Sequence, residues 1–368
     1  MYLKKTSYMQ TYSYKQLYNQ IISVFKKIGL NNSDAQKVTE ILLAAELRGI
    51  NSHGVIRIKD YIQLWQKGRI NSKPDIRITY ETPSTAVING DKGLGMIVAT
   101  MAMNVAIKKA KNIGTGWVSV NNSNHFGIAG YYSMMALEHD MIGISMTNAN
   151  PFVAPTFSVD RLLGTNPIAV AIPAGKENPF IADFATTPIA RGKLALMHKK
   201  GENAPVGYVQ DKDGQASTDP NILTEGGAIL PLGGDRLHGS HKGYCLGAIV
   251  DIFSGVLSGA NYGPFVPPSV SFLPVKDNLP GKGTGHFFGA IRIDAFQPAD
   301  EFKKHIDKWI QTFKNAKPAK GQERVYVPGE PEREMEEKLK KDGIPVLDKV
   351  LEELKEVCEE LEVNFELL

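Results

Sequence analysis

Cysteine is nearly absent from the 368-residue sequence, in which Cys245 and Cys358 are the only two. They are too few and too far apart for a disulfide framework, and neither belongs to a paired metal-ligand spacing. His238 and His241 lie in a glycine-rich stretch without a carboxylate at ligand spacing, so no metal site is predicted. This cysteine usage favours a reducing compartment, and we expect a cytoplasmic protein.

Long apolar runs and charge of one sign are also lacking. The longest apolar run is far too short to span a membrane, and Met1 to Thr11 has no apolar stretch that resembles a secretory signal. The 42 basic and 39 acidic residues give a formal net charge of +3, and no basic run resembles a nucleic-acid footprint. Neither a membrane nor a nucleic acid is therefore expected as a partner.

Two widespread motifs for nucleotide binding and hydrolysis are missing. The stretch Gly93-Leu94-Gly95 lacks the third glycine of Gly-X-Gly-X-X-Gly, and the glycines at 281, 283 and 285 precede a predicted strand instead of following one. A Rossmann dinucleotide fold is therefore not supported. No Gly-X-Ser-X-Gly elbow occurs, which argues against a serine hydrolase built on Ser52-His53.

The first 75 residues show helical periodicity. Helices are predicted from Ser13 to Gly29, from Ser33 to Gly49, and from Ile58 to Trp65, with Ser33 and Gln36 as a capping box. A turn that contains His53 separates the second helix from the third.

From residue 76 onward, predicted strands alternate with predicted helices, which indicates an α/β (α+β) fold. The predicted strands cover 76–81, 85–89, 117–120, 142–146, 168–172, 180–184, 206–210 and 286–293. The predicted helices cover 94–112, 131–138, 188–198, 244–257 and 299–313, followed by two charged helices after Pro331. Residues 211–240 are rich in Gly, Asp and Pro and are predicted to form a long surface loop.

Three short polar segments interrupt apolar sequence: 51–54, 122–127 and Asp183. Together they supply the imidazoles of His53 and His125 and one carboxylate. Histidine is the side chain whose ordinary pKa lies near neutral pH, and a carboxylate in an apolar strand needs a partner. These residues predict an enzyme that transfers protons.

Each of these features also has a plain structural interpretation, which stays open at this point. Ser52 can cap a helix while His53 bonds a carbonyl, and residues 121–127 can form an ordinary Asx turn. Arg57 lies one helical turn after His53, where it can hold a substrate carboxylate through a bidentate fork or can simply be a surface arginine.

Two loops and one lysine are candidates for binding an anion. Residues 148–151 and 164–167 are short loops at strand ends whose amides can cradle a phosphate, although turns of this composition are common. Lys242 is predicted in the first turn of a helix, where it opposes the helix dipole unless an anion sits there. The alternative is a solvated lysine.

Six segments in one order resemble the malate/L-lactate dehydrogenase family, which is unrelated to the Rossmann-type dehydrogenases. The resemblance covers roughly residues 13–350. The segments are Arg48-Gly49-Ile50-Asn51-Ser52-His53-Gly54-Val55, Asn124-His125-Phe126-Gly127, Gly164-Thr165-Asn166-Pro167, Asp183-Phe184-Ala185-Thr186, His241-Lys242-Gly243-Tyr244 and Tyr326-Val327-Pro328-Gly329-Glu330.

The resemblance implies hydride transfer between an (S)-2-hydroxy acid and NAD, with NADP possible, and malate/oxaloacetate as the preferred pair. L-lactate, sulfolactate, ureidoglycolate and cyclic imino acids are alternative substrates, and a non-catalytic ligand-binding protein on the same scaffold is an alternative of another class. The implied catalytic residues are His53 as acid/base, Ser52 and Asp183 as its relay, and His125 as the rival acid/base. The implied substrate-binding residues are Arg57, Arg48 and His125. The implied cofactor-binding residues are Ala149, Thr165, Asn166, Asp183, Phe184, Ala185, Lys242, Gly243, Gly329 and Glu330.

The same resemblance implies a domain division and a homodimer. A helical N-terminal segment, 1–75, is expected to pack with C-terminal helices at 298–368. Residues 76–128 and 298–350 are expected to form a substrate and dimerisation domain, and residues 129–297 a non-Rossmann cofactor-binding domain.

Overall fold

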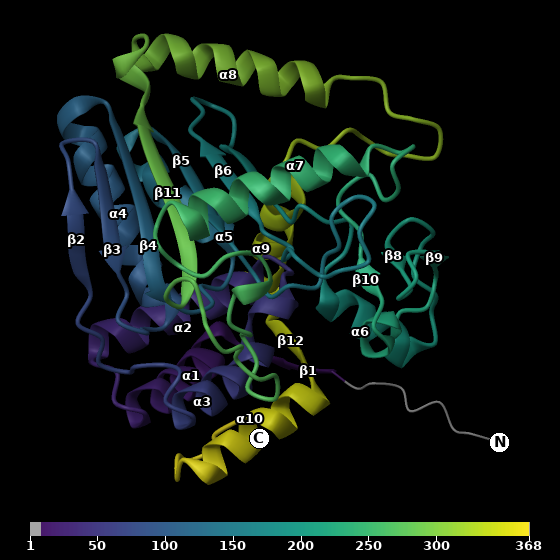
Figure 1. Ribbon diagram of the computed structural model, residues 1–368. Coiled ribbons are helices and arrows are strands. Elements are labelled where there is room, and N and C mark those ends of the chain that lie inside the picture. The colour runs from purple at the N-terminus through teal and green to yellow at the C-terminus, as the bar shows by residue number, and fades with distance from the viewer. Residues whose placement is uncertain (1–8, 368) are drawn as a thin grey trace.

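The computed structural model describes residues 9–367, and for residues 199 and 200 it describes the backbone alone. Figure 1 shows a central sheet with helices on both faces, a group of helices at one end of the sheet, and a smaller lobe at one side. The group of helices contains both ends of the described chain.

The three helices predicted near the N-terminus are confirmed. They are α1 (Tyr14–Lys27), α2 (Asn32–Leu47) and α3 (Ile58–Gln66), and the short turns η1 (Asn51–His53) and η2 (Val55–Arg57) join α2 to α3. Their apolar faces enter the main hydrophobic core, as the predicted periodicity requires.

The predicted cap of α2 is wrong. Asn31 caps this helix by accepting the backbone N–H of Asp34 at 2.9 Å, so Ser33 lies inside the first turn and forms no capping box with Gln36. Asparagine is among the strongest N-cap residues, and its position two residues earlier decides where the helix begins. A capping box forms instead at Ser13, the cap of α1.

Seven strands form the central sheet in the order β2-β3-β4-β11-β5-β6-β7. They are β2 (Arg77–Glu81), β3 (Thr85–Asn89), β4 (Thr115–Ser123), β5 (Met141–Thr147), β6 (Ile168–Ile172), β7 (Phe180–Phe184) and β11 (Thr284–Arg292). Only β3 and β4 pair in parallel, and every other pairing in this sheet is antiparallel. A Rossmann sheet is parallel, so this sheet agrees with the missing glycine fingerprint.

The sheet is covered on both faces, in keeping with the two-residue period of its strands. The elements that pack on its strands are α4 (Gly95–Ile113), α5 (Ala129–Met135), η3 (Ala136–His139), α7 (Ser240–Asp251) and η5 (Ile252–Val256). The other helical elements of this part of the chain are η6 (Gly263–Phe265), η7 (Ile293–Ala295) and α8 (Ala299–Lys314). Val118 and Val120 of β4 are buried in the main core with α4. Phe287 of β11 lies on the opposite face, where its ring centroid is 5.0 Å from that of Phe253 in η5.

The side lobe has a small core of its own. It consists of α6 (Arg191–Lys200), β8 (Val209–Gln210), β9 (Ala216–Ser217), η4 (Ile222–Glu225) and β10 (Ala228–Ile229). The strand predicted at 206–210 shrinks to the two residues of β8. The continuous loop predicted over 211–240 is also wrong, because Ile222 and Ile229 are buried and order this stretch around them.

The two ends of the described chain meet. β1 (Met9–Tyr12) pairs antiparallel with β12 (Ile344–Leu347), which connects α9 (Glu330–Asp342) to α10 (Asp348–Glu360). Sequence patterns did not predict this pair, since its partners lie at opposite ends of the chain. α10 packs on α3, where Lys59 forms an ion pair with Glu356 at 2.6 Å.

The domain boundaries stay a prediction. β11 pairs with both β4 and β5, so the sheet is continuous across the boundary expected at residues 128 and 129. Among residues 9–367, no helix is long and apolar enough to cross a membrane.

Candidate active site

A buried carboxylate from α2 holds the turn that carries His53. Glu46 accepts the backbone N–H of Val55 at 2.7 Å and also the side-chain amide of Asn51. Gly54 lies so close that a Cβ on it would stand 2.1 Å from Glu46 Oε1. Any larger residue at position 54 would therefore require the Glu46 carboxylate or the turn to shift.

His53 and His125 form a stacked pair with ring centroids 5.4 Å apart. His53 Nδ1 is 2.9 Å from Ser52 Oγ. His125 Nδ1 is 2.8 Å from the Tyr61 hydroxyl and accepts the backbone N–H of Gly127 at 3.3 Å. Because an N–H donates to it, Nδ1 of neutral His125 carries no proton, and the ring proton lies on Nε2.

Both histidines favour the neutral form. Burial, followed by the charge of Arg57, lowers the pKa of His53 to about 4. Burial, then Arg57 and then His53, holds the pKa of His125 well below its usual value. The two side chains nevertheless stay half-buried, so a small molecule can reach them. The pair therefore provides accessible, uncharged imidazoles at neutral pH.

The guanidinium of Arg57 is largely engaged by the protein. Nη1 pairs with Asp60 at 2.9 Å, and Nη2 donates to the hydroxyl of Ser269 at 3.0 Å and to its carbonyl at 3.3 Å. The bidentate fork expected to hold a substrate carboxylate is thus occupied. Nε is buried without a hydrogen-bond partner in the described chain.

Arg48, the second substrate-binding candidate, is buried and faces α9. Its Nη1 lies 3.4 Å from a carboxylate oxygen of Glu336. Its charge also acts on Asp183, as the pKa of that carboxyl shows. Arg48 therefore interacts with α9 through its ion pair and with β7 through its charge.

Asp183, at the end of β7, contacts the His125 loop. Its Oδ2 accepts the backbone N–H of Gly130 at 2.7 Å, which anchors the first turn of α5. The expected direct contact with His53 is not formed anywhere in residues 9–367. Part of Asp183 is exposed, but its carboxylate is surrounded by protein atoms, and this burial raises its pKa to about 6.

Three predicted cofactor residues, Ala149, Thr165 and Asn166, lie together. Asn166 is fully buried, its Oδ1 accepts the N–H of Ala149 at 3.0 Å, and its Nδ2 donates to the carbonyl of Gly247 in α7 at 2.9 Å. The carbonyl of Thr165 accepts the N–H of Thr186 at 2.9 Å. The buried side-chain amide of Asn166 therefore joins its own loop to the loop of Ala149 and to α7.

The beginning of α7 presents a lysine that can meet a phosphate. Gly239 precedes the helix with φ of 95° and no side chain caps the first turn, but the N–H of Ser240 donates to the carbonyl of Asp235 and that of Lys242 to the carbonyl of Gly239, both at 2.9 Å. Lys242 is exposed in the first turn. Gly243 packs so tightly that a Cβ on it would lie 2.3 Å from the carbonyl oxygen of Leu232. The backbone of Leu232 thus fills the space beside Gly243, and the exposed cation of Lys242 is the feature of this turn that suits the phosphates of a dinucleotide.

Phe184 and Ala185 connect this region to β7. Phe184 is exposed and Ala185 is half-buried, and the next residue, Thr186, accepts the N–H of Leu232 at 3.0 Å through its carbonyl. The end of β7 therefore lies beside the segment that leads into α7.

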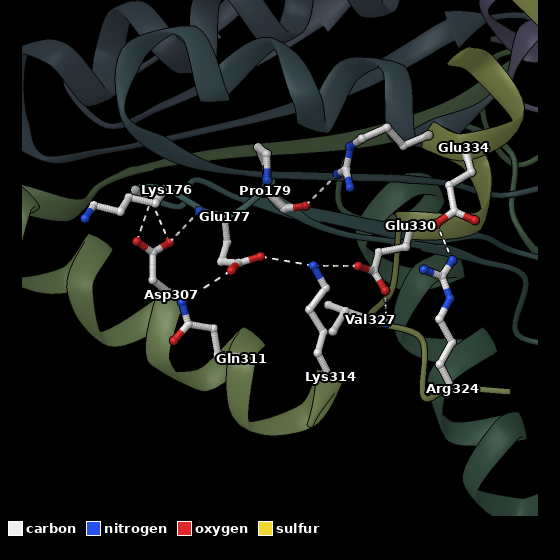
Figure 2. Close-up of polar contacts among 12 residues, drawn as sticks. Lys176, Glu177, Pro179, Asp307, Gln311, Lys314, Arg324, Val327, Glu330 and Glu334 are labelled. Carbon is white, nitrogen blue, oxygen red and sulfur yellow. Dashed lines mark hydrogen bonds and ion pairs between the residues drawn. The ribbon is translucent and has the colours of Figure 1, made fainter. Parts of the chain in front are cut away.

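Gly329 and Glu330 begin α9 beside β7. Gly329 has φ of 94°, and a Cβ on it would lie 2.9 Å from Cβ of Ile181. Glu330 accepts the N–H of Val327 at 2.8 Å and pairs with Lys314 of α8 at 2.9 Å, as Figure 2 shows. Burial opposes ionisation, yet these two contacts lower the pKa of Glu330 overall. Its carboxylate joins α8 to α9, and its role in cofactor binding stays a prediction.

Three polar residues beside the histidines were missed by the sequence analysis. Tyr61 occupies an apolar-face position of α3, and His286 lies in a strand, where neither residue type stands out. Glu46 had a usable signal, because it interrupts an apolar run as Asp183 does. Burial raises the pKa of Glu46 to about 7, although Asn51 and Val55 act against this shift. Within residues 9–367 no group of three or more His, Cys, Asp or Glu side chains is arranged to hold a metal.

A family model described as malate/L-lactate dehydrogenase matches residues 12–355. The chain belongs to this family. The resemblance seen in the six segments is thereby confirmed, and this malate/L-lactate dehydrogenase family member is an enzyme that acts as a dehydrogenase on hydroxy acids.

Its relatives carry different substrate names. A malate dehydrogenase from Pyrococcus horikoshii is 44% identical over 351 residues, which are 95% of each chain. The solved structure of malate dehydrogenase from that organism aligns with a TM-score of 0.88 and 41% identity over 99% of both chains. An L-sulfolactate dehydrogenase from Methanocaldococcus jannaschii is 43% identical over 94% of this chain and 96% of its own. A ureidoglycolate dehydrogenase from Escherichia coli is 31% identical over 93% and 94%.

Proposed function

We propose that this family member interconverts (S)-malate and oxaloacetate with NAD as its cofactor. The observation that carries the proposal is the stacked His53–His125 pair, in which each Nδ1 is bonded to a protein group. This leaves each Nε2 available to the oxygen on the reacting carbon. The malate dehydrogenase relative at 44% identity supports malate as the substrate.

His53 accepts the hydroxyl proton of malate. It is neutral before the reaction, because its pKa is about 4, and Ser52 Oγ can accept the Nδ1 proton of the imidazolium that forms. His125 cannot accept this proton at Nε2, since that nitrogen already carries its own. His125 instead donates a hydrogen bond to the same substrate oxygen, and in the reverse direction it polarises the keto group.

Arg57 attracts the carboxylate next to the reacting carbon. Its positive charge lies close enough to His53 to lower the pKa of that ring, and it acts on the carboxylate through this charge in place of the fork first expected. A bound carboxylate also offsets the effect of Arg57 on the histidines, which raises their pKa values and favours proton uptake.

The residues that we propose to bind the dinucleotide lie around the beginning of α7 and the end of β7. Lys242 in the first turn of α7 would hold a phosphate, and Ala149, Thr165, Asn166 and the end of β7 would line the dinucleotide. Bound there, NAD would supply the acceptor for the hydride that leaves the hydroxyl-bearing carbon. NADP is the alternative, and a cytoplasmic location stays a prediction from sequence.

A homodimer also stays a prediction from the family resemblance. One exposed apolar face offers a surface for it, formed by residues at helical spacing in α7 and η5. These residues are Ile249, Ile252, Phe253, Val256 and Leu257. Sedimentation of the wild type and an Ile252→Lys variant tests whether this face joins two copies.

Substrate preference is tested by the loss of NADH absorbance with oxaloacetate, sulfopyruvate, pyruvate and piperideine-2-carboxylate. We expect the highest kcat/KM with oxaloacetate. Sulfopyruvate is the second candidate, because a relative at 43% identity is named L-sulfolactate dehydrogenase. If oxaloacetate is no faster than the other three, the malate proposal is wrong. Inertness toward all of them with both NADH and NADPH would favour a ligand-binding protein.

A further inference from the structure

Arg191, the first residue of α6, presents a guanidinium whose hydrogen-bonding capacity is unused. It is half-buried and lies over the rings of Phe152 and Phe272, 5.8 and 5.7 Å from their centroids. No carboxylate in residues 9–367 forms an ion pair with it, and no side chain there accepts a hydrogen bond from it. Aromatic faces hold the cation in place but leave its N–H donors free.

This guanidinium belongs to the surroundings of His53. Gly192, the next residue, lies against Ser52, since a Cβ on Gly192 would be 3.6 Å from Ser52 Cβ. Ser52 is hydrogen-bonded to His53. The first turn of α6 therefore stands beside the histidine pair, although it comes from the side lobe.

Arg191 also lies close to Arg57 and Asp60. Burial and then the charge of Arg57 lower the pKa of Arg191, while Asp60 raises it. Both arginines in turn act to lower the pKa of Asp60, although burial keeps it raised. The carboxylate of Asp60 pairs with Arg57 alone, so within residues 9–367 the positive charge of Arg191 is left without an ion-pair partner near two neutral histidines.

The two arginines differ in what they can still bind. Arg57 has given both Nη atoms to Asp60 and Ser269, whereas Arg191 keeps its whole fork. Two neighbouring guanidinium groups repel each other, and an anion between or beside them removes that repulsion. The arrangement is therefore that of a site completed by an acidic ligand.

We propose that Arg191 binds the second acid group of the substrate, the carboxylate or sulfonate beyond the reacting carbon. The inference rests on the proposed function and deepens it by naming the substrate class, 2-hydroxy acids with two acid groups. Arg57 ends the short turn that follows His53, and its charge acts on the His53 ring, so it suits the acid group adjacent to the reacting carbon. Arg191 approaches from another segment and suits the distal group. A substrate such as lactate has no group for it.

The test compares Arg191→Met and Arg191→Lys with wild type, using oxaloacetate, sulfopyruvate and pyruvate at saturating NADH. Methionine removes the charge and keeps an apolar stem against the two rings. We expect kcat/KM for the two diacids to fall by at least about 30-fold in Arg191→Met, while pyruvate changes by less than about 3-fold. Arg191→Lys should retain part of the diacid activity, because it keeps the charge and loses the fork.

The matched control is Lys193→Met, which removes an exposed cation from the same helix and should leave all three substrates unchanged. If kcat/KM in Arg191→Met fell equally with all three substrates, the inference would be overturned. An unchanged ratio of kcat/KM for the diacids to that for pyruvate would overturn it as well. A higher KM for NADH with an unchanged diacid preference would assign Arg191 to the cofactor instead.

A binding measurement separates this inference from the proposed function. In the absence of cofactor, (S)-malate, whose second carboxylate lies beyond the hydroxyl-bearing carbon, should raise the Tm of wild type more than lactate does, and this difference should vanish in Arg191→Met. If wild type reduces no 2-oxo acid but the difference between the two Tm shifts still depends on Arg191, the proposed function fails and the acid-binding site at Arg191 is supported. If wild type is active and the larger Tm shift with malate survives in Arg191→Met, the inference alone fails.

Discussion

The stacked pair His53–His125 and the neighbouring His286 are the same chemical group in two different settings. His286 is fully buried, and both of its ring nitrogens are bonded, Nδ1 with Thr147 at 2.7 Å and Nε2 with Ser123 at 2.8 Å. His53 and His125 are half-buried, and in each only Nδ1 is bonded to the protein.

Lowered pKa values do not distinguish the two settings. Burial lowers the pKa of His286 to about 3 and that of His53 to about 4. The distinction lies in an accessible nitrogen without a protein partner. An enclosed imidazole with both nitrogens hydrogen-bonded, as in His286, stabilises the fold around Phe126, whose ring stacks on it at 4.8 Å. An imidazole with one accessible nitrogen that has no protein partner can exchange a proton with a ligand.

The largest expected effect is the loss of kcat when His53, the proposed base of the histidine pair, is replaced. His53→Ala should lower kcat for malate oxidation by about 10²-fold or more and leave NADH binding nearly intact, since a general base is lost. Lys242→Ala should instead raise the KM for NADH first. Steady-state kinetics and NADH fluorescence titration measure both, and the reverse pattern would refute the two role assignments.

A smaller effect is expected from the group that fixes the His125 ring. Tyr61→Phe removes the hydroxyl at Nδ1 and should lower kcat by about 3- to 10-fold, the range expected for one hydrogen bond. Nitrogen NMR of the imidazole should also show a larger share of the Nδ1–H form than in wild type. An unchanged tautomer would mean that Gly127 alone fixes the ring.

His286 should affect stability more than catalysis. His286→Gln should lower the free energy of unfolding by about 1 to 3 kcal/mol at pH 7, because buried hydrogen bonds and packing are lost. In wild type, the unfolded chain binds a proton at His286 below about pH 6.5, whereas the folded chain does so only near pH 3, so stability falls as the pH drops.

The difference in the free energy of unfolding between wild type and His286→Gln should therefore become smaller from pH 7 to pH 5, by about 2 kcal/mol at most. Urea unfolding of both proteins at the two pH values measures it. The kcat per folded molecule should change by less than about 3-fold. A gap that stays constant, or a loss of kcat as large as that of His53→Ala, would remove the distinction between the two settings.

Local patterns predicted the elements and the chemistry, and long-range contacts decided the rest. His53 and His125 stand out in sequence because polar residues surround them in turns. Tyr61 and Arg191 do not, because a tyrosine on an apolar helix face and an arginine at a helix start have no local signature of a site. Asp183 was recognised as a buried acid, but its partner Gly130 lies far away in sequence and was not predictable. The pairing of β1 with β12 was missed for the same reason.

The central claim is that His53 enters the reaction as a neutral, accessible base. Titration of the protein with carbon-labelled histidine rings measures this directly by NMR, and the His53 signal is assigned by its absence in His53→Gln. The account predicts a pKa near 4, well below the ordinary value of 6.5, and a rise in that pKa in Arg57→Met, because Arg57 contributes to the shift. A His53 pKa at or above 6.5, unchanged by Arg57→Met, would contradict it.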